Sequence, residues 1–375
     1  MQRNIISLLL FLFIMTMSFT DVFILENEYI RPYTLCCFCL IFVIFTTKLK
    51  VKKHIITLLF FITLFLIFNL LTPFVIAPNK HLRYIAAFIG VALFHFIIIS
   101  QSLQKIEVAK AQKYILYSIS FVCILAVTEF LINVFFQEFS YPFRANKANA
   151  VIFFKRSYAF ATEPSTLGAF IVSLLPLVDI RKYSNRQLMC FYVLVTSAIV
   201  STLSIYVIII FILYSFYQIN YRYILLLLFI MLIGWNFIPN EIVTAFSNKL
   251  FFEGASGSSI ERLDHLTRSI DESFNNIFFG MGWGAETQII YSSSHNFFIG
   301  VLVSNGIIGV LFLALFLLMT FFRYPPFKSS LNKKSWECII LSGFFLLTSS
   351  SFYEPSYLFG LAFLTAYGHI RGENV

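Results

Sequence analysis

One short segment of a very apolar chain gathers side chains that could do chemistry. Residues 292–309 read SSSHNFFIGVLVSNGIIG, so His295 and Asn296 stand directly before a long hydrophobic run. Histidine is the usual general base near neutral pH, because its ordinary pKa is about 6.5. A histidine at the edge of a membrane helix is also a common interfacial residue, so other parts of the chain must decide between the two interpretations. The glycines that follow form, with Asn305, a small-residue pattern that predicts close helix packing.

An upstream segment, residues 137–164, combines basic, aromatic and apolar residues and ends at the start of a hydrophobic run. Its Arg156 could bind an anion, because a guanidinium group matches two phosphate oxygens at once. Glu163 precedes the hydrophobic run, and Ser165 or Thr166 is expected to cap the helix there. Two simpler interpretations stay open. Long loops cross a membrane largely regardless of charge, and Glu163 could serve the electrostatics of the helix start.

A second long segment, residues 239–296, leads into the histidine. Between residues 259 and 275 its apolar residues recur at helical spacing, which predicts an amphipathic helix. Arg262 and Arg268 lie on this helix and are further candidates for binding an anion. Because they are six positions apart they need not share a face. Pairing with neighbouring acidic side chains is the simpler interpretation of Arg262.

Three glycines alternate with Met281 and Trp283 between residues 280 and 284. Glycine tolerates positive φ angles, so this run predicts tight turns and room for a ligand to approach the backbone. The G-x-G-x-G pattern is not a dinucleotide fingerprint, because the preceding strand and following helix of that motif are not indicated. The two long segments contain no paired D-x-D carboxylates, so positive charge for an anion site has to come from side chains.

The composition indicates the class of protein. Hydrophobic residues make up 59% of the 375 residues and charged residues 12%, and the mean hydropathy is +0.84. Such a chain is too apolar for a soluble globular protein and is expected to be an integral membrane protein. The six cysteines fall within apolar runs or at their edges, so they are expected to pack as small thiols.

Apolar runs bounded by polar clusters predict an all-α polytopic membrane protein, with residues 1–375 forming one integral membrane domain. We expect about twelve transmembrane helices, or eleven if the run from 188 to 219 is one tilted helix. The predicted spans are 4–20, 32–47, 55–72, 84–100, 114–136, 165–180, 188–202, 204–219, 223–238, 297–320, 336–351 and 356–370. Short basic loops place both termini in the cytoplasm, so the two long segments, 137–164 and 239–296, are expected to be periplasmic loops.

The order of these motifs resembles a known family. They are RSYAFATEPSTLG from residue 156, S-x-x-x-R from 258, N-x-x-F-G-M-G-W-G from 276 and HNFFIGVLVSNGIIG from 295. The chain resembles the O-antigen polymerase and O-antigen ligase superfamily, and most of all the Wzy-type polymerases of bacterial surface polysaccharides. Specific motifs cover residues 156–168 and 258–309, and the hydropathy pattern is similar over the whole chain.

The resemblance implies a GT-C-like, multi-spanning glycosyltransferase in the bacterial inner membrane, with its active site on the periplasmic face. Such an enzyme joins oligosaccharide repeat units carried on undecaprenyl pyrophosphate and needs neither a cofactor nor a catalytic metal. By resemblance, His295 orients or deprotonates the acceptor hydroxyl, while Arg156 and Arg262 hold the donor pyrophosphate. The further residues expected at the substrate are Arg268, Glu163 and Asn296.

The expected partners are the lipid-linked glycan donor and acceptor and the lipid bilayer, with a chain-length regulator and a flippase as further candidates. No nucleic-acid partner is expected. Two other functions stay open. One is transfer of finished polysaccharide to another acceptor, as O-antigen ligases do, because the residues that assist the leaving group would be similar. The other is transport of lipid-linked oligosaccharide. A transporter would be expected to have ionisable residues at mid-membrane, where Glu129 and Asp179 are almost the only candidates.

Overall fold

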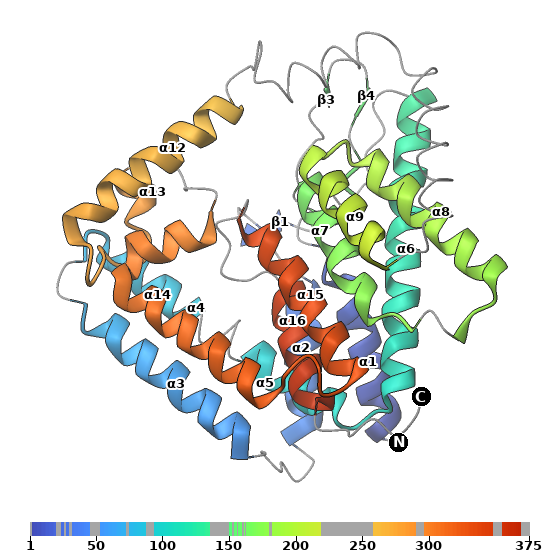
Figure 1. Cartoon of the computed structure of the whole chain (residues 1–375), viewed down its shortest axis with the longest axis horizontal. Helices are drawn as coiled ribbons and strands as arrows, with labels where there is room; N and C mark the ends of the chain where they lie inside the picture. The colour runs from blue at the N-terminus through green and yellow to red at the C-terminus, as the bar shows by residue number, and fades with distance from the viewer. Residues whose placement is uncertain are drawn as a thin grey trace.

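A computed structural model describes residues 2–19, 24–25, 28–29, 32–45, 53–72, 75–87, 94–135, 150–151, 154–155, 157–159, 161, 163–179, 182–218, 258–289, 296–347 and 355–368. These residues are mostly helical (Figure 1). The helices are α1 (Gln2–Thr16), α2 (Pro32–Phe45), α3 (Lys53–Leu70), α4 (Pro78–Ala87), α5 (Phe94–Leu103), α6 (Val108–Phe135), α7 (Pro164–Leu174), α8 (Asn185–Ser201), α9 (Ile205–Gln218), α12 (Ser258–Ser273), α13 (Glu286–Ile289), α14 (Phe297–Arg323), α15 (Ser330–Leu346) and α16 (Pro355–Tyr367).

Short elements complete the described part of the chain. The 3-10 turn η2 (Leu175–Leu177) continues α7, and η4 (Phe274–Asn276) continues α12. Strands β1 (Ile24–Leu25) and β2 (Glu28–Tyr29) pair antiparallel, as do β3 (Ala150–Val151) and β4 (Phe154–Lys155). The amphipathic helix predicted between residues 259 and 275 is confirmed as α12 and η4.

Most predicted spans coincide with a helix to within a few residues, because long apolar runs leave helix as the natural way to satisfy the backbone. The predicted span 84–100 overlaps the end of α4, which begins at Pro78, and most of α5, which begins at Phe94; residues 88–93 lie outside the described part of the chain. The predicted span 223–238 lies outside the described residues. The division of 188–219 is confirmed: α8 ends and α9 begins around Leu203, whose φ of 48° is left-handed.

Two of the described helices are long and apolar enough to cross a membrane, as judged from length and composition. They are α6, with 28 residues, and α14, with 27. Crossing about 30 Å of hydrocarbon takes roughly 20 helical residues. Several shorter apolar helices accompany them, among them α1, α2 and α9. The total of about twelve spans stays a prediction.

The helices form two groups (Figure 1). The larger contains α1, α2, α5 to α9, α15 and α16, which share an extensive cluster of buried aliphatic and aromatic side chains. In the smaller group α3, α12 and α13 contact α14, around a small cluster of Met281, Ala285 and Val303. Phe316 of α14 packs against the larger cluster, so α14 belongs to both groups.

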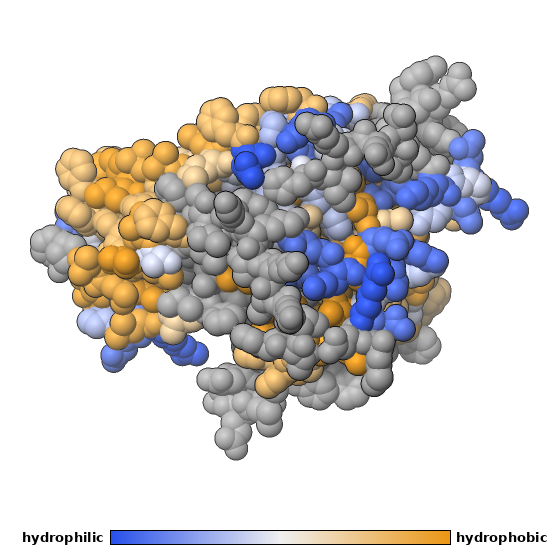
Figure 2. All heavy atoms as spheres, turned by 90° about the horizontal axis from the view of Figure 1, so that it is seen from below, coloured by the Kyte–Doolittle hydropathy of each residue, from blue (hydrophilic) through white to orange (hydrophobic). Residues whose placement is uncertain are grey.

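Hydrophobic side chains cover much of the described surface on the side of α3 and α14, at the left of both views (Figure 2). The exposed large side chains on these two helices include Phe60, Leu70, Leu311, Leu315 and Phe322. An exposed apolar surface of this extent is unfavourable in water. It fits a helix bundle whose outer face contacts lipid.

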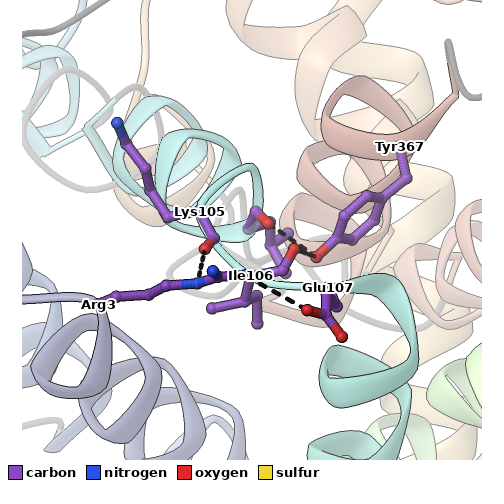
Figure 3. Close-up of polar contacts among 6 residues, drawn as sticks. Arg3, Lys105, Ile106, Glu107 and Tyr367 are labelled. Carbon is purple, nitrogen blue, oxygen red and sulfur yellow. Dashed lines mark hydrogen bonds and ion pairs between the residues drawn. The ribbon is translucent and has the colours of Figure 1, made fainter.

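One polar tie holds the beginning and end of the larger group together (Figure 3). The Arg3 side chain donates to the Lys105 carbonyl (3.1 Å) and pairs with Glu107 (3.5 Å). Nearby, the Tyr367 hydroxyl lies 2.8 Å from the Leu103 carbonyl. Because the α5–α6 link accepts from both α1 and α16, the two ends of the described chain lie at the same end of the bundle (Figure 1).

A buried carboxylate fixes the segment that leads into α7. Glu129 of α6 is fully buried, and its Oε2 accepts from the backbone N–H groups of Tyr158 (2.8 Å) and Ala159 (2.7 Å). The Ser157 hydroxyl lies 3.1 Å from the same oxygen, and the Ser157 N–H donates to the Ser201 carbonyl (3.0 Å). Glu129 therefore joins α6 to the residues directly after Arg156 and, through Ser157, to the end of α8.

We predict that Glu129→Leu destabilises the protein by about 2 to 6 kcal/mol, because each of two buried N–H groups loses its acceptor at about 1–3 kcal/mol. Glu129→Gln keeps one oxygen that can accept both bonds, so its effect should be much smaller. The measurement is the apparent melting temperature of the purified variants in detergent. Equal melting of Glu129→Leu and wild type would show that the carboxylate does not hold this segment.

A second carboxylate joins α7 to α15. Asp179 lies two residues after Leu177, the last residue of η2, and contacts Lys182 (3.1 Å) and Lys334 (3.4 Å). Burial disfavours the charged carboxylate, but hydrogen bonds and attraction from the two ammonium groups outweigh it and lower the pKa of Asp179 below its ordinary value of 3.8. Its ionised form therefore stabilises the folded state above that pH.

We predict that Asp179→Asn costs about 1 kcal/mol at neutral pH, a value discounted for partial solvent screening. Because the folded pKa is the lower one, the wild-type advantage is present above pH 3.8 and disappears as the pH falls through the folded pKa. Unfolding measured from pH 3 to 7 tests this. The control is Glu107→Gln, whose carboxylate is 79% exposed in its pair with Arg3 and should contribute almost nothing.

Candidate functional site

Helix α14 is broken one third of the way along. Gly306 has φ 62° and ψ −166°, so the helical path stops there and resumes at once. A residue in this conformation interrupts the ladder of backbone hydrogen bonds. The carbonyls of Val303 and Ser304 lose their helical donors, and the N–H groups of Ile307 and Ile308 lose their acceptors. In an apolar setting these four groups need other partners.

The segment after α12 supplies all four partners. The N–H groups of Met281 and Gly282 donate to the carbonyls of Val303 and Ser304, both at 2.9 Å. In return, the N–H groups of Ile307 and Ile308 donate to the carbonyls of Ile277 (2.8 Å) and Phe278 (3.3 Å). The 277–282 segment, a turn at 277–279 followed by irregular backbone, thus supplies the hydrogen-bond partners that α14 lacks at the break. This docking fixes where α12 stands relative to α14.

Two glycines make the close approach possible. Gly280 has φ 70°, and a Cβ there would collide with the backbone of Ser304 and Asn305. A Cβ at Gly306 would collide with the Phe278 carbonyl. Gly306 belongs to a small-residue pattern that predicts close packing between helices. That prediction is wrong for Gly306: it breaks the helix, and its neighbour is the 277–282 segment.

A buried chain of side-chain hydrogen bonds surrounds the break. The Trp283 indole N–H donates to Asn305 Oδ1 (2.6 Å), and the Asn305 amide donates to Asn69 Oδ1 of α3. The Asn69 amide in turn donates to the Phe65 carbonyl (2.7 Å). Trp283 is 1% exposed and both asparagines are fully buried. The network therefore connects α3, the glycine run and the broken helix in one hydrogen-bonded unit.

His81 of α4 completes this network and has a defined protonation state there. Its Nδ1 accepts from the Trp283 backbone N–H (2.8 Å), and its Nε2 lies 2.9 Å from the Asn69 carbonyl. An N–H can only donate and a carbonyl can only accept, so the ring is neutral with its proton on Nε2. His81 is 4% exposed. Its role in this arrangement is to hold α4 against the glycine run.

Asn296 has a structural role at the start of α14. It is the N-cap residue, and its Oδ1 accepts from the N–H groups of Phe298 (3.0 Å) and Ile299 (3.2 Å). His295, the expected base, lies outside the described residues. It directly precedes Asn296 in the chain.

A buried acid lies beside the same helix start. Glu286 of α13 is 8% exposed, and a methyl group placed on Gly300 would lie 3.5 Å from its Oε1. The carboxylate therefore lies beside the first turn of α14, where the helix dipole makes negative charge favourable. Nothing in the sequence indicates Glu286, because a single acid in a loop has no periodic or motif signal.

Two of the three arginines expected at the substrate lie in the described part of the chain. Arg156 lies outside the described residues. Arg262 is in α12, which packs against α14 and lies above it in Figure 1. Arg268 is on an exposed face of α12 and pairs with Asp264 (2.9 Å), as an i,i+4 pair on a helix surface does. The structure brings the helix of Arg262 and the start of α14 into one unit.

Glu163 marks the start of α7, where the expected cap is corrected. Glu163 itself is the N-cap residue, with Pro164 at the first helical position, and neither Ser165 nor Thr166 is the cap. Proline fits there because its fixed φ suits a helix start and it has no N–H to satisfy. The Ser165 hydroxyl donates to the Glu163 carboxylate (3.0 Å), and Glu163 is exposed. These contacts match the helix-start interpretation of Glu163.

Asn69 and His81 were also missed from the sequence. Asn69 interrupts the predicted span 55–72, and a polar residue inside a span is a recognisable signal. His81 lies between Lys80 and Arg83 in a polar stretch, where nothing in the sequence indicates a buried partner. No protein-family model matches the chain, and no curated protein matches its sequence at a significant level.

We predict that Gly306→Ala lowers stability by at least about 1–3 kcal/mol, the usual cost of forcing a side chain into such a backbone conformation. The collision with the Phe278 carbonyl adds to this. Gly343→Ala is the matched control, because Gly343 lies in α15 with nothing near its missing Cβ. Alanine should stabilise that helix by about 0.5–1 kcal/mol. Melting in detergent distinguishes the two, and equal effects would contradict the docking at Gly306.

Proposed function

We propose that this protein is a membrane glycosyltransferase that polymerises undecaprenyl-pyrophosphate-linked oligosaccharide repeat units on the outer face of the bacterial inner membrane. The proposal starts from the resemblance of the motifs to the O-antigen polymerase and ligase superfamily. One structural observation supports it most. Two of the motifs, the glycine-rich one from residue 276 and the one from residue 295, hydrogen-bond to each other at the break in α14. A chance set of loop motifs would not be expected to share one hydrogen-bonded frame.

The proposed reaction needs an anion site and a base. A sugar hydroxyl of the incoming lipid-linked unit attacks C1 of the growing chain. The C1–O bond to the pyrophosphate breaks, and the new glycosidic bond forms at that carbon. His295 takes the hydroxyl proton, and undecaprenyl pyrophosphate leaves with the electrons of the broken bond. Positive side chains are needed because the leaving group is already anionic and gains further charge.

The residues of this chain would divide this work as follows. Arg262 of α12 and Arg156 bind the pyrophosphate, and Arg268 exchanges its surface partner Asp264 for phosphate when substrate is present. His295 precedes Asn296, the N-cap of α14, and the dipole of a helix favours negative charge near its N-terminus. Glu286, whose carboxylate lies beside the first turn of α14, would supply a polar group next to the segment that carries His295.

The contacts of Glu129 and the break in α14 would allow the segments with Arg156, Arg262 and His295 to act together. Anchoring by Glu129 fixes the residues that follow Arg156, and the α14 break fixes those that follow Arg262. Positioning of reacting groups supplies much of an enzyme's rate, so both anchors would matter for activity as well as for stability. No metal or nucleotide is assigned a role in the proposal.

We predict that His295→Ala lowers the polymerisation rate about 10²- to 10⁴-fold through loss of the base. Loss of a charge-stabilising group in Arg262→Ala should cost about 10²- to 10³-fold. The measurement uses purified protein in detergent with lipid-linked repeat units and no nucleotide, and follows the ladder of chain lengths by electrophoresis. Arg323→Ala, at the far end of α14, is the matched control and should leave the ladder unchanged.

Each alternative has its own outcome in this assay. A normal ladder from the His295 variant would contradict its role as the base. Binding of lipid-linked substrate without turnover by wild-type protein would contradict a polymerase and favour a transporter. Transfer of preformed polysaccharide to an added acceptor glycolipid, without chain extension, would identify a ligase instead.

A further inference from the structure

An open groove runs between α6 and α8, away from the broken helix. Its volume is about 530 Å³. Its walls are mainly apolar and include Leu116 of α6 with Leu188, Phe191 and Leu194 of α8. Because α6 is one of the two described helices long and apolar enough to cross a membrane, a groove along its flank would open toward hydrocarbon. A water-filled apolar groove would be unfavourable, so an apolar occupant is expected.

One end of this groove is polar and cationic. Tyr117, Tyr183 and Arg186 line it there. The Lys113 ammonium lies 5.4 Å from the centre of the Tyr117 ring, which places a second cation beside the same end. Arg186 is exposed and forms no ion pair with another described residue. Two cations and two hydroxyl groups thus gather at the end of an apolar groove.

The nearby acid does not cancel this charge. Asp179 is held by Lys182 and Lys334, so the three groups together are positive. Burial and the neighbouring Tyr117 raise the pKa of Tyr183, while Lys113 and Lys182 act in the opposite direction. Because the pKa of Tyr183 is raised, its hydroxyl stays protonated as a hydrogen-bond donor at neutral pH.

We propose that the α6–α8 groove binds one anionic phospholipid, with an acyl chain along the apolar walls and the phosphate at Lys113, Tyr183 and Arg186. A cationic pocket between membrane helices is the kind of site that recognises acidic headgroups. The inference does not depend on the proposed glycosyltransferase activity, because none of these residues belongs to the candidate site.

The shape of the groove favours a lipid over a free phosphate. A phosphate ion would use the cationic end alone and leave the leucine and phenylalanine walls unoccupied. Phosphatidylcholine would fill the walls equally well, but its choline cation would offset the charge of its phosphate and repel Lys113 and Arg186. An anionic phospholipid satisfies both parts, through apolar burial and charge complementarity.

Cys190 gives a direct test, because it lines the groove and is exposed. Cys39 of α2 is also exposed, does not line the groove, and serves as the internal control. The full-length protein in neutral detergent is mixed with phosphatidylglycerol, with phosphatidylcholine of the same chains, or with inorganic phosphate. Maleimide labelling of each cysteine is then timed by peptide mass spectrometry. We expect phosphatidylglycerol to slow labelling of Cys190 and to leave Cys39 unchanged.

In the double variant Lys113→Gln and Arg186→Gln, the phosphatidylglycerol concentration that half-protects Cys190 should rise about thirtyfold. Each cation removed near an acidic headgroup contributes a factor of about five. Lys328→Gln is the matched control, an exposed lysine in the α14–α15 link, outside the groove, and should protect as wild type does. Unchanged melting temperatures of both proteins would show that any difference in protection comes from the groove.

Three results would overturn the proposal. Equal protection by phosphatidylcholine would show an ordinary boundary lipid without headgroup selection. Protection by inorganic phosphate alone would show an anion site that ignores the apolar walls. No protection by any of them would show that the groove binds none of these molecules.

Discussion

The break in α14 is the constraint on which the candidate site depends. A helix that crosses an apolar region has to satisfy its own backbone groups, and the turn at Gly306 leaves two carbonyls and two N–H groups without helical partners. The 277–282 segment satisfies all four. Unmaking that docking would expose four polar backbone groups at once, so the loop and the helix have to fold together.

Side-chain hydrogen bonds around these four backbone bonds hold the same segments in place. Trp283 and Asn305 are hydrogen-bonded to one another, and Asn69 and His81 bring α3 and α4 to the same point. Each of these polar groups is buried, and each has a partner with matching donor or acceptor character. A fully satisfied buried network favours one arrangement strongly, because any shift leaves a polar group without a partner. The broken part of α14 and the glycine run are therefore held in one arrangement. Arg268, in contrast, lies exposed on α12.

The same physical device recurs in the larger group of helices. Glu129 lies within the long apolar helix α6, where an acid could suggest a transport path, yet its carboxylate accepts from the backbone of Tyr158 and Ala159 and from the Ser157 hydroxyl. Asp179 lies beyond the end of η2 and is held by two lysines. Both acids thus join segments that are distant in the sequence.

The apolar runs by themselves determined most of the helices, because a long run of hydrophobic residues is compatible with few other structures. The periodic pattern from residue 259 likewise determined α12. Helix starts were less well determined: the sequence indicated Ser165 or Thr166 as the cap of α7, and the chain uses Glu163 followed by Pro164. Several residues can serve as caps within one turn, so local preference does not choose between them.

The sequence also determined that residues 280–284 can turn tightly and that residues 295–309 carry polar and small residues. Only the tertiary structure decided that these two segments are partners. The glycines could equally have packed one helix on another. Which surface a glycine faces depends on contacts between residues distant in the chain, and no local pattern records them. The burial of Asn69, His81 and Glu286 follows from the same long-range contacts, whose free energy exists only once α3, α4, α13 and α14 have come together.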